Sequence, residues 1–474
     1  MKFKILLFLV VLGISLNLNG QNKFDQTELV GSWLGKLKVQ GFELRLIFNL
    51  SENESGTLMA TMDSPDQGAK GISMGDVSFD GENLKINAPA IRGYYLGEMQ
   101  GVDSLKGTWH QNGQSFELAL KKQAKAFTFN RPQEPKAPFP YLVEEVKFKN
   151  ENAGHTLAGT LTLPKGEGEF PAVILISGSG AQNRNEEIFG HKPFMVIADY
   201  FAKQGIAVLR YDDQGVGQSG GSQLGTTTYN YSFDAEAALK FLRMDERINS
   251  KAIGFAGHSE GGLIASMVSS RIEGVAFLIS LGGPALPGSE IILSQTKALA
   301  KAQGMPEDEI SKQFEQNKTL FEILMNENNN EKAQELMLKS YALSLKESGK
   351  NETEIAEEVQ AFKQNYPKVV YNWMRYYLKT DPADFLVKMK CPVLVLNGDK
   401  DLQVISKQNL NAYEQIFKKS GLKDYELIEL KNHNHLFQHC KTGLPSEYGS
   451  IEESFSEEAM EMMANWIWKR FLKE

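Results

Sequence analysis

The chain has 474 residues, of which 42% are hydrophobic and 23% are charged. This length and apolar content allow large buried cores and predict two or three domains. The formal net charge is −8 and no basic stripe runs through the sequence, so nucleic acid is excluded as an expected partner.

The first twenty residues have the pattern of a secretory signal peptide. Lys2 and Lys4 precede an apolar run at 5–12, and the chain turns polar by Asn17. The apolar run is too short to cross a bilayer, and no later stretch is long enough. We therefore expect a signal peptide at residues 1–20 with cleavage after Gly20, a secreted or periplasmic protein, and no membrane span.

Residues 21–122 are predicted to form an N-terminal β domain. Apolar and polar residues alternate in short runs such as 44–50, and turns with glycine, asparagine or aspartate separate the runs. This pattern predicts a small all-β barrel or sandwich. Trp33 and Trp109 lie near its two ends. They suit sugar or lipid binding, but we favour the interpretation that they fill the interior.

A proline-rich segment, residues 123–141, follows the predicted β domain. Pro132, Pro135, Pro138 and Pro140 prevent a regular helix or a central strand over this stretch. The segment is therefore predicted to be a linker.

Residues 142–474 are predicted to form one α/β domain. The expected strands lie at 143–148, 157–163, 171–176, 205–211, 252–256, 275–280, 392–396 and 425–430, and the expected helices at 195–204, 233–244 and 454–471. Alternation of this kind predicts a mostly parallel sheet with helices on both faces. In such sheets, active groups lie in loops at the carboxyl ends of the strands.

One insertion interrupts the alternation of strand and helix. Residues 285–388 have no buried-strand pattern and are predicted to be helical. Because the insertion follows a strand at the end of the sheet expected to hold the active groups, we predict a cap over the site. Its aromatic residues suit either an acyl pocket or the core of the cap, and these are Tyr371, Trp373, Tyr376 and Tyr377.

The strongest chemical motif is GHSEG at residues 257–261, between an apolar strand pattern and a helix pattern. A serine on a sharp strand-to-helix turn is held in strained geometry, and the glycines two positions to either side let strand and helix pass closely. The helix N-terminus favours the negative charge that develops in acyl transfer. Ser259 is therefore the predicted nucleophile, against the alternative of an ordinary glycine-rich turn.

A glycine-rich loop, SGSG at 177–180, is predicted to supply part of an oxyanion hole. Its glycines let backbone N–H groups approach a ligand, so Ser179, or otherwise Gly180, joins the N–H of Glu260 as a donor. The alternative is a flexible turn, but the position directly after a buried strand favours the oxyanion role. Two roles stay open for the Glu260 side chain, which are sensing a polar substrate and pairing with Arg184.

An acid and a base follow two later strands. Asp401 lies beyond the turn after one strand, whereas Asp399 is expected to cap that turn. His435 lies furthest along the loop after the last strand and is preferred over His433 as the general base. The order Ser259, Asp401, His435 is the chain order typical of this kind of sheet.

No metal and no cofactor are expected. Three of the seven histidines lie between 433 and 439, but no second His/Asp/Glu group has convincing ligand spacing. Cys391 and Cys440 are expected at opposite ends of one strand, so we predict two unpaired thiols.

From about residue 143 to the end, the chain resembles secreted bacterial α/β-hydrolase esterases. The motifs that carry the resemblance are LISGSG at 175–180, VLRYDD at 208–213, GHSEGG at 257–262, GDKD at 398–401 and NHLFQ at 434–438. The resemblance implies a Ser-His-Asp triad at the residues argued above. It extends to the front of the chain, because a subset of these enzymes has a β domain with Gly-x-Trp tripeptides there. Gln214 departs from the family pattern, which has arginine at that position.

We therefore predict a serine carboxylic-ester hydrolase that acts through an acyl-enzyme on a small-molecule or glycan ester. A peptidase or amidase of the same fold is the second hypothesis. Prolyl-oligopeptidase-type enzymes usually carry a β-propeller before the hydrolase domain, and the predicted N-terminal β domain has too few residues to form one. A non-catalytic protein that binds envelope glycans is the third. The oligomeric state is not predicted.

Overall fold

The computed structural model describes residues 24–39, 42–111, 113–125 and 127–471, and these fall into two units. The first unit holds the described residues up to 64 together with 69–127, and the second holds 65–68 and the chain from 128 onward. The predicted signal peptide lies outside the described residues.

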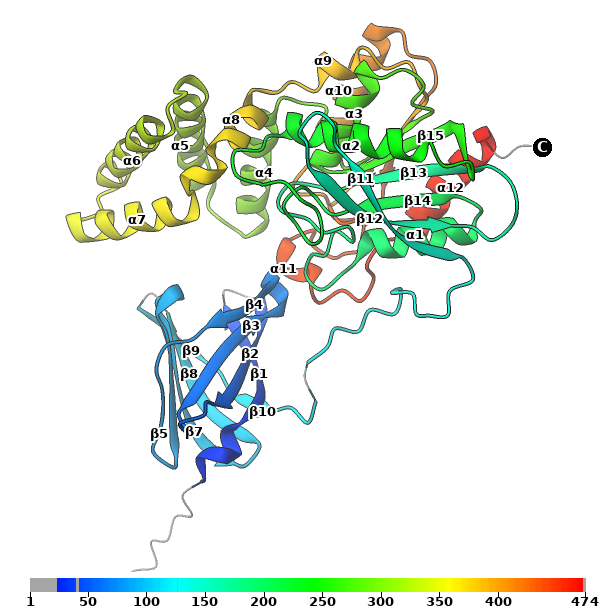
Figure 1. Ribbon diagram of the computed structural model, residues 1–474. Helices are drawn as coiled ribbons and strands as arrows, with labels where there is room; N and C mark the ends of the chain where they lie inside the picture. The colour runs from blue at the N-terminus through cyan, green and yellow to red at the C-terminus, as the bar shows by residue number, and fades with distance from the viewer. Residues whose placement is uncertain (1–23, 40–41, 112, 126, 472–474) are drawn as a thin grey trace, which may run out of the picture. The chain divides into compact units, whose positions relative to one another are not determined.

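The first unit is an all-β unit with ten strands, which Figure 1 draws in blue and cyan. The strands are β1 (Gly31–Val39), β2 (Phe42–Glu52), β3 (Leu58–Ser64), β4 (Ala69–Ser73), β5 (Val77–Phe79), β6 (Asn83–Ala88), β7 (Gly93–Gly101), β8 (Ser104–Gln111), β9 (Gln114–Glu117) and β10 (Leu120–Lys122). Nine of them follow the order β4-β3-β2-β1-β10-β8-β7-β6-β5, and β9 pairs with β8. The paired strands run antiparallel, so the prediction of a small β region ahead of the α/β fold is confirmed.

The two tryptophans of the β unit are part of its core. Trp33 and Trp109 are 0% and 1% exposed. The Trp33 indole N–H donates to the carbonyl of Leu29 at 2.7 Å, and the Trp109 ring lies 6.0 Å from that of Phe48. Their interior role is therefore confirmed, because side chains this buried offer no surface for a sugar or a lipid. Short 3-10 helices accompany the strands at Gln26–Leu29 and Pro89–Ile91, and a third, at Pro65–Gln67, belongs to the second unit.

The second unit is built on an eight-stranded sheet with the order β11-β12-β14-β13-β15-β16-β17-β18. Its strands are β11 (Leu142–Lys149), β12 (Thr156–Leu163), β13 (Phe170–Ile176), β14 (Ala207–Tyr211), β15 (Ile248–His258), β16 (Leu278–Leu281), β17 (Val393–Gly398) and β18 (Tyr425–Leu430). The hairpin β11/β12 and the pair β12/β14 are antiparallel, and the remaining pairs are parallel. The predicted mostly parallel α/β sheet is confirmed.

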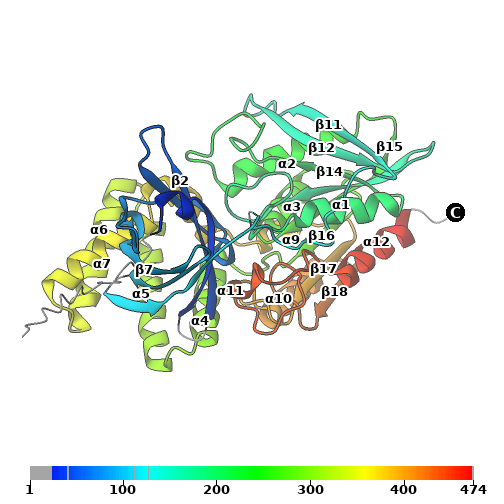
Figure 2. The ribbon, with the colours of Figure 1, turned by 90° about the horizontal axis from the view of Figure 1, so that it is seen from below.

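Helices cover both faces of this sheet, as the apolar strand residues on both faces require. One face packs against α2 (Thr228–Leu242), α3 (Glu260–Arg271) and α10 (Ser406–Ser420). The other packs against α1 (Pro193–Lys203) and α12 (Glu457–Phe471), which Figure 2 shows together along the sheet. A short helix, α11 (Pro445–Tyr448), precedes α12.

Between β16 and β17 the chain forms a helical insertion. It contains α4 (Gly288–Ala302), α5 (Glu307–Asn326), α6 (Asn330–Glu347), α7 (Glu352–Asn365), a 3-10 turn (Lys368–Val370), α8 (Tyr371–Lys379) and α9 (Ala383–Leu386). Tyr371 packs in the insertion's own apolar cluster, whereas Tyr377 packs on Leu263 and Met267 of α3. The aromatic residues therefore serve the packing of the insertion and its attachment to the helix that follows Ser259.

Three other features of the second unit bear on the sequence predictions. Residues 128–141 of the predicted linker lie in this unit, where the Gln133 side chain donates to the carbonyl of Phe455 at 2.8 Å and accepts from the N–H of Ser454 at 2.6 Å. Cys391 and Cys440 are unpaired, as predicted. Among the described residues, we find no helix with the length and apolar character that a membrane span needs.

Candidate active site

Ser259 lies on a strained turn between β15 and α3. Its φ of 52° places a non-glycine residue in the left-handed region, and it is the N-cap residue of α3. The Ser259 N–H donates to the carbonyl of Leu281 on the neighbouring strand β16 at 2.9 Å, which fixes the turn at the carboxyl edge of the sheet. The side chain is thereby held at the N-terminus of a helix, where unpaired backbone N–H groups favour negative charge.

The two glycines that flank this turn have no room for a side chain. A Cβ on Gly257 would lie 2.2 Å from the carbonyl oxygen of Gly261, and a Cβ on Gly261 would lie 2.2 Å from that of Ile176. Real Cβ atoms do not approach backbone this closely, so the motif's glycines are required by the contact between β15, α3 and the neighbouring strand β13.

Asp401 and His435 form a buried pair at the same edge of the sheet. Asp401 Oδ2 lies 2.7 Å from His435 Nδ1, and the residues are 2% and 4% exposed. The other carboxylate oxygen, Oδ1, accepts from the N–H groups of Gln403 and Val404, each at 2.8 Å. Because both oxygens are engaged, the carboxylate is fixed in the orientation that holds the proton of the imidazole on Nδ1.

A pair of glycines after β16 lies between this pair and the serine turn. A Cβ on Gly282 would lie 3.4 Å from His435 Nδ1, and one on Gly283 would lie 3.4 Å from the carbonyl oxygen of Ser259. The structure therefore brings together Ser259, Asp401 and His435, although they are far apart in the sequence.

The loop after β13 lies against the serine. A Cβ on Gly178 would lie 3.2 Å from Ser259 Cβ, and the Gly178 N–H is already engaged by Glu186 at 2.7 Å. The next residues, Ser179 and Gly180, are exposed. Across from them, the N–H of Glu260 belongs to the first turn of α3 and has no carbonyl partner within the helix. Gly178 and Glu260 thus lie next to Ser259, and Ser179 and Gly180 directly follow Gly178 in the chain.

The side chain of Glu260 is buried, and its carboxylate contacts the helical insertion. Trp373 of α8 donates its indole N–H to Glu260 Oε1 at 2.9 Å. Burial raises the pKa of this carboxyl, while the hydrogen bond from Trp373 opposes the rise. Arg184 instead binds Asp212 at 2.8 Å and Glu145, so the Arg184–Glu260 pair, one of the two roles left open from sequence, is not formed.

Sequence reasoning missed a second histidine–carboxylate pair, formed by His258 and Glu186. His258 Nδ1 lies 2.8 Å from Glu186 Oε1, and His258 Nε2 lies 2.9 Å from the carbonyl oxygen of His435. Burial lowers the pKa of His258, but the carboxylate of Glu186, the carbonyl of His435 and the charge of Asp401 together outweigh burial, so this pKa is raised. Glu186 thereby connects the loop at Gly178 to the loop that carries His435. The only sequence signal was the histidine inside GHSEG, since nothing near Glu186 marks it.

The VLRYDD segment, residues 208–213, contacts the loop after β13. Ser177 donates its hydroxyl to Asp213 Oδ1 at 3.0 Å, and burial raises the pKa of Asp213. Gln214, which departs from the family pattern, donates its amide to the carbonyl of Ser222 at 2.6 Å and to the hydroxyl of Thr226 at 2.5 Å. The loop at residues 214–226, after β14, is thus ordered by an amide at this position.

The rejected alternatives for acid and base have other roles. Asp399 is exposed, and its carboxylate accepts from the N–H of Asn432 at 2.6 Å, so it caps the loop after β18. His433 Nδ1 lies 2.8 Å from the carbonyl oxygen of Lys431. Burial lowers the pKa of His433. Asp399 and His433 therefore both make contacts with the loop after β18, and Asp401 is the carboxylate that His435 contacts.

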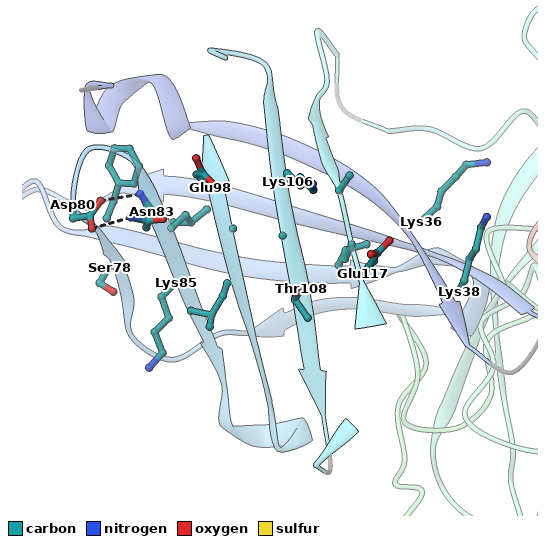
Figure 3. Close-up of a pocket in the computed structure, with 17 residues that line it drawn as sticks. Lys36, Lys38, Ser78, Asp80, Asn83, Lys85, Glu98, Lys106, Thr108 and Glu117 are labelled. Atoms are coloured by element: carbon teal, nitrogen blue, oxygen red, sulfur yellow. Dashed lines mark hydrogen bonds between the residues drawn. The ribbon is translucent and has the colours of Figure 1, made fainter. Parts of the chain in front are cut away.

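A separate open cleft of about 1050 Å³ lies on the β unit (Figure 3). Its lining combines apolar residues with charged residues of both signs, and the charged members are Lys36, Lys38, Asp80, Lys85, Glu98, Lys106 and Glu117. Asp80 is held in place by Asn83, whose backbone N–H donates to it at 2.8 Å. None of the 17 described lining residues is a histidine or a cysteine, so this cleft lacks the general base of a serine hydrolase.

Comparison with known proteins identifies similar chains. A family model described as the alpha/beta hydrolase fold matches residues 171–439. Esterase EstD from Thermotoga maritima is 25% identical over 311 residues, which cover 65% of this chain and 65% of that protein. Esterase FrsA from Serratia proteamaculans is 28% identical over 200 residues, which cover 41% of this chain and 45% of that one. The chain thus spans less than two thirds of the length of either relative. A solved esterase from Pyrococcus furiosus has 16% identity and a TM-score of 0.43, with 74% of this chain and 100% of that chain covered.

Proposed function

Because the chain belongs to the alpha/beta hydrolase fold family, we propose that it is a serine carboxylic-ester hydrolase. The observation that carries the proposal is the buried Asp401–His435 pair at 2.7 Å beside the strained turn of Ser259. Two curated relatives named as esterases support the reaction class. A nucleophile, an oriented base and backbone donors are the groups that acyl transfer needs.

In the proposed first half-reaction, Ser259 Oγ attacks the ester carbonyl while His435 Nε2 accepts its proton. Asp401 keeps the other imidazole proton on Nδ1 and stabilises the imidazolium that forms. The carbonyl oxygen becomes an oxyanion held by the N–H groups of Glu260 and Ser179, with Gly180 as the alternative donor. His435 then gives its proton to the leaving alkoxide, and the acyl group stays on Ser259.

In the second half-reaction, water takes the place of the alcohol. His435 removes a proton from the water as it attacks the acyl carbonyl, and the same donors hold the second oxyanion. Collapse of this intermediate returns the proton to Ser259 Oγ and releases the carboxylic acid. Each step of the proposed route uses only groups of the chain, the ester and water.

The substrate class that we propose is a small-molecule or glycan ester. Trp373 and Tyr377 attach the helical insertion to α3 at the end that carries Ser259, so the insertion is the element expected to bound the acyl or alcohol pocket. A screen of p-nitrophenyl esters of increasing chain length, together with acetylated glycans, tests this class. The ester with the largest kcat/KM identifies the acyl group.

The reaction class is tested with an active-site probe and two paired substrates. A fluorophosphonate probe is expected to label the wild-type protein and to leave Ser259→Ala unlabelled. Hydrolysis of p-nitrophenyl acetate is expected to exceed hydrolysis of peptide p-nitroanilides, and the reverse ranking would favour a peptidase. Absence of labelling in a folded wild-type protein would favour the non-catalytic binding role.

We also propose that residues 1–20 direct export of the protein. The support is the charged start, the apolar run at 5–12 and the polar residues that follow. N-terminal sequencing of the protein from its native host is expected to begin at Gln21. A mature protein that retains Met1 would contradict this.

A further inference from the structure

Three side chains with metal-ligating atoms gather at the base of the loop that carries His435. His433 and His439 come from the two sides of that loop, and Glu458 comes from the first turn of α12. One ligand atom from each of the three lies within 4.8 Å of those of the other two. The rings of the two histidines lie 4.2 Å apart, centre to centre.

The hydrogen bonds of both imidazoles leave the same nitrogen open. His433 Nδ1 lies 2.8 Å from the carbonyl oxygen of Lys431, and His439 Nδ1 lies 3.0 Å from Glu453 Oε2. Carbonyl and carboxylate oxygens only accept, so each Nδ1 donates and each neutral ring carries its lone pair on Nε2. Histidines that bind a metal through one ring nitrogen almost always donate the N–H of the other ring nitrogen to a carbonyl or carboxylate oxygen. That hydrogen bond fixes the tautomer and the ring orientation.

The Nε2 atom of His433 is an independent sign of a missing partner. His433 is 0% exposed, and no atom of the described residues hydrogen bonds to its Nε2. A buried polar atom without a partner costs stability, so native structures rarely contain one. His439 and Glu458 are exposed, which gives an ion a path from solvent to this buried nitrogen.

We propose that His433, His439 and Glu458 bind one divalent transition-metal ion of the zinc type, with water in the remaining position. Two imidazole nitrogens and one carboxylate favour Zn²⁺, Co²⁺ or Ni²⁺, whereas Mg²⁺ and Ca²⁺ favour sites made of oxygen alone. Glu453 takes the role of the carboxylate that orients His439.

The place of the site in the fold gives the ion a structural role. His433 and His439 face each other across an antiparallel β-bridge, and the loop between them carries His435. An ion on both residues closes this loop at its base, and Glu458 joins the closed loop to α12. The ion therefore braces the segment that holds the general base, and it takes no part in the ester chemistry proposed above.

The test uses the full chain without a polyhistidine tag, stripped with a chelator and titrated with Zn²⁺ by calorimetry. We expect saturable binding of one ion per chain, a higher melting temperature with Zn²⁺, and intense visible d–d bands with Co²⁺. Neither Mg²⁺ nor Ca²⁺ is expected to compete. Absence of saturable binding overturns the proposal.

Variants at the exposed ligands test the ligand set without disturbing the core. His439→Ala and Glu458→Gln are each expected to weaken Zn²⁺ binding by on the order of 100-fold, and Glu453→Gln by about 10-fold. Glu457→Gln is the matched control, since Glu457 is an exposed neighbour in the same helical turn outside the group. Zn²⁺ affinity that is unchanged in His439→Ala or in Glu458→Gln overturns the ligand set. Ser259→Ala is expected to bind Zn²⁺ normally, so the result is independent of the ester-hydrolase proposal.

Discussion

Two buried histidine–carboxylate pairs lie side by side at the edge of the sheet, with the rings of His435 and His258 4.8 Å apart. Their carboxylate contacts are nearly equal, at 2.7 Å for Asp401–His435 and 2.8 Å for Glu186–His258. They differ at the far nitrogen, because His258 Nε2 is engaged by the carbonyl oxygen of His435. An imidazole engaged at both nitrogens holds structure in place, whereas an imidazole fixed only at Nδ1 is arranged to move a proton.

The largest effect is expected from removal of the imidazole that we propose as the general base. His435→Ala is expected to lower kcat for ester hydrolysis by on the order of 10⁶-fold, because the nucleophile loses its base. The measurement is steady-state hydrolysis of p-nitrophenyl acetate, with circular dichroism to show that the fold is retained. Full activity in this variant would transfer the role of base to His433.

The next effect separates the two carboxylates that follow β17. Asp401→Asn is expected to lower kcat by about 10⁴-fold, since an amide favours the wrong imidazole tautomer. Asp399→Asn is the matched control, and it changes only a contact to the N–H of Asn432, so kcat is expected to stay near wild type. If Asp399→Asn lost more activity than Asp401→Asn, the assignment of the acid would be wrong.

A smaller effect is expected from the second pair. Glu186→Gln and His258→Gln are expected to lower kcat by on the order of 10²-fold, because the loops at Gly178 and His435 lose their shared anchor and the reacting groups shift. Fluorophosphonate labelling is expected to slow and not to vanish, which distinguishes a positioning role from proton transfer. A loss of activity equal to that of His435→Ala would contradict a merely positioning role for the Glu186–His258 pair.

The smallest effect concerns pH and stability. The pKa of His258 is raised above its ordinary value of 6.5, so its charged form stabilises the fold. That contribution is fully present below about pH 6.5 and is lost as pH rises through the folded-state pKa. The difference in unfolding free energy between wild type and His258→Gln, measured by urea denaturation, is therefore expected to shrink as pH is raised. A difference that grows with pH would mean that His258 is neutral in the fold.

These pairs also show what the sequence could and could not predict. The α/β order was readable because buried strands and helices have different apolar periods, and GHSEG stood out because only glycine fits the contacts at Gly257 and Gly261. Asp401 and His435 could be placed because each follows a strand of the parallel sheet, and loops at the same sheet edge converge.

The missed features depend on side chains that meet across long stretches of sequence. Glu186 lies in an irregular loop, 72 residues before His258, and no periodicity marks it. The Trp373–Glu260 contact joins residues 113 apart, and sequence gave no reason to prefer it over Arg184. Glu458 lies on α12, for which the sequence pattern predicted only the apolar face. Its position beside His433 and His439 depends on how α12 packs against the sheet.

The crowding around Gly257 and Gly261 also bears on how such a protein can evolve. A single methyl group at either position would overlap a backbone carbonyl, so the turn that carries Ser259 tolerates neither alanine nor any larger residue there. The insertion between β16 and β17 packs largely on its own apolar cluster, and its comparable restriction is Gly288, where a Cβ would lie 2.0 Å from the carbonyl oxygen of Tyr377. In a saturation library selected for activity, Gly257, Gly261 and Gly288 should stay invariant while other positions of the insertion vary, so new substrates become accessible without any change in the reaction.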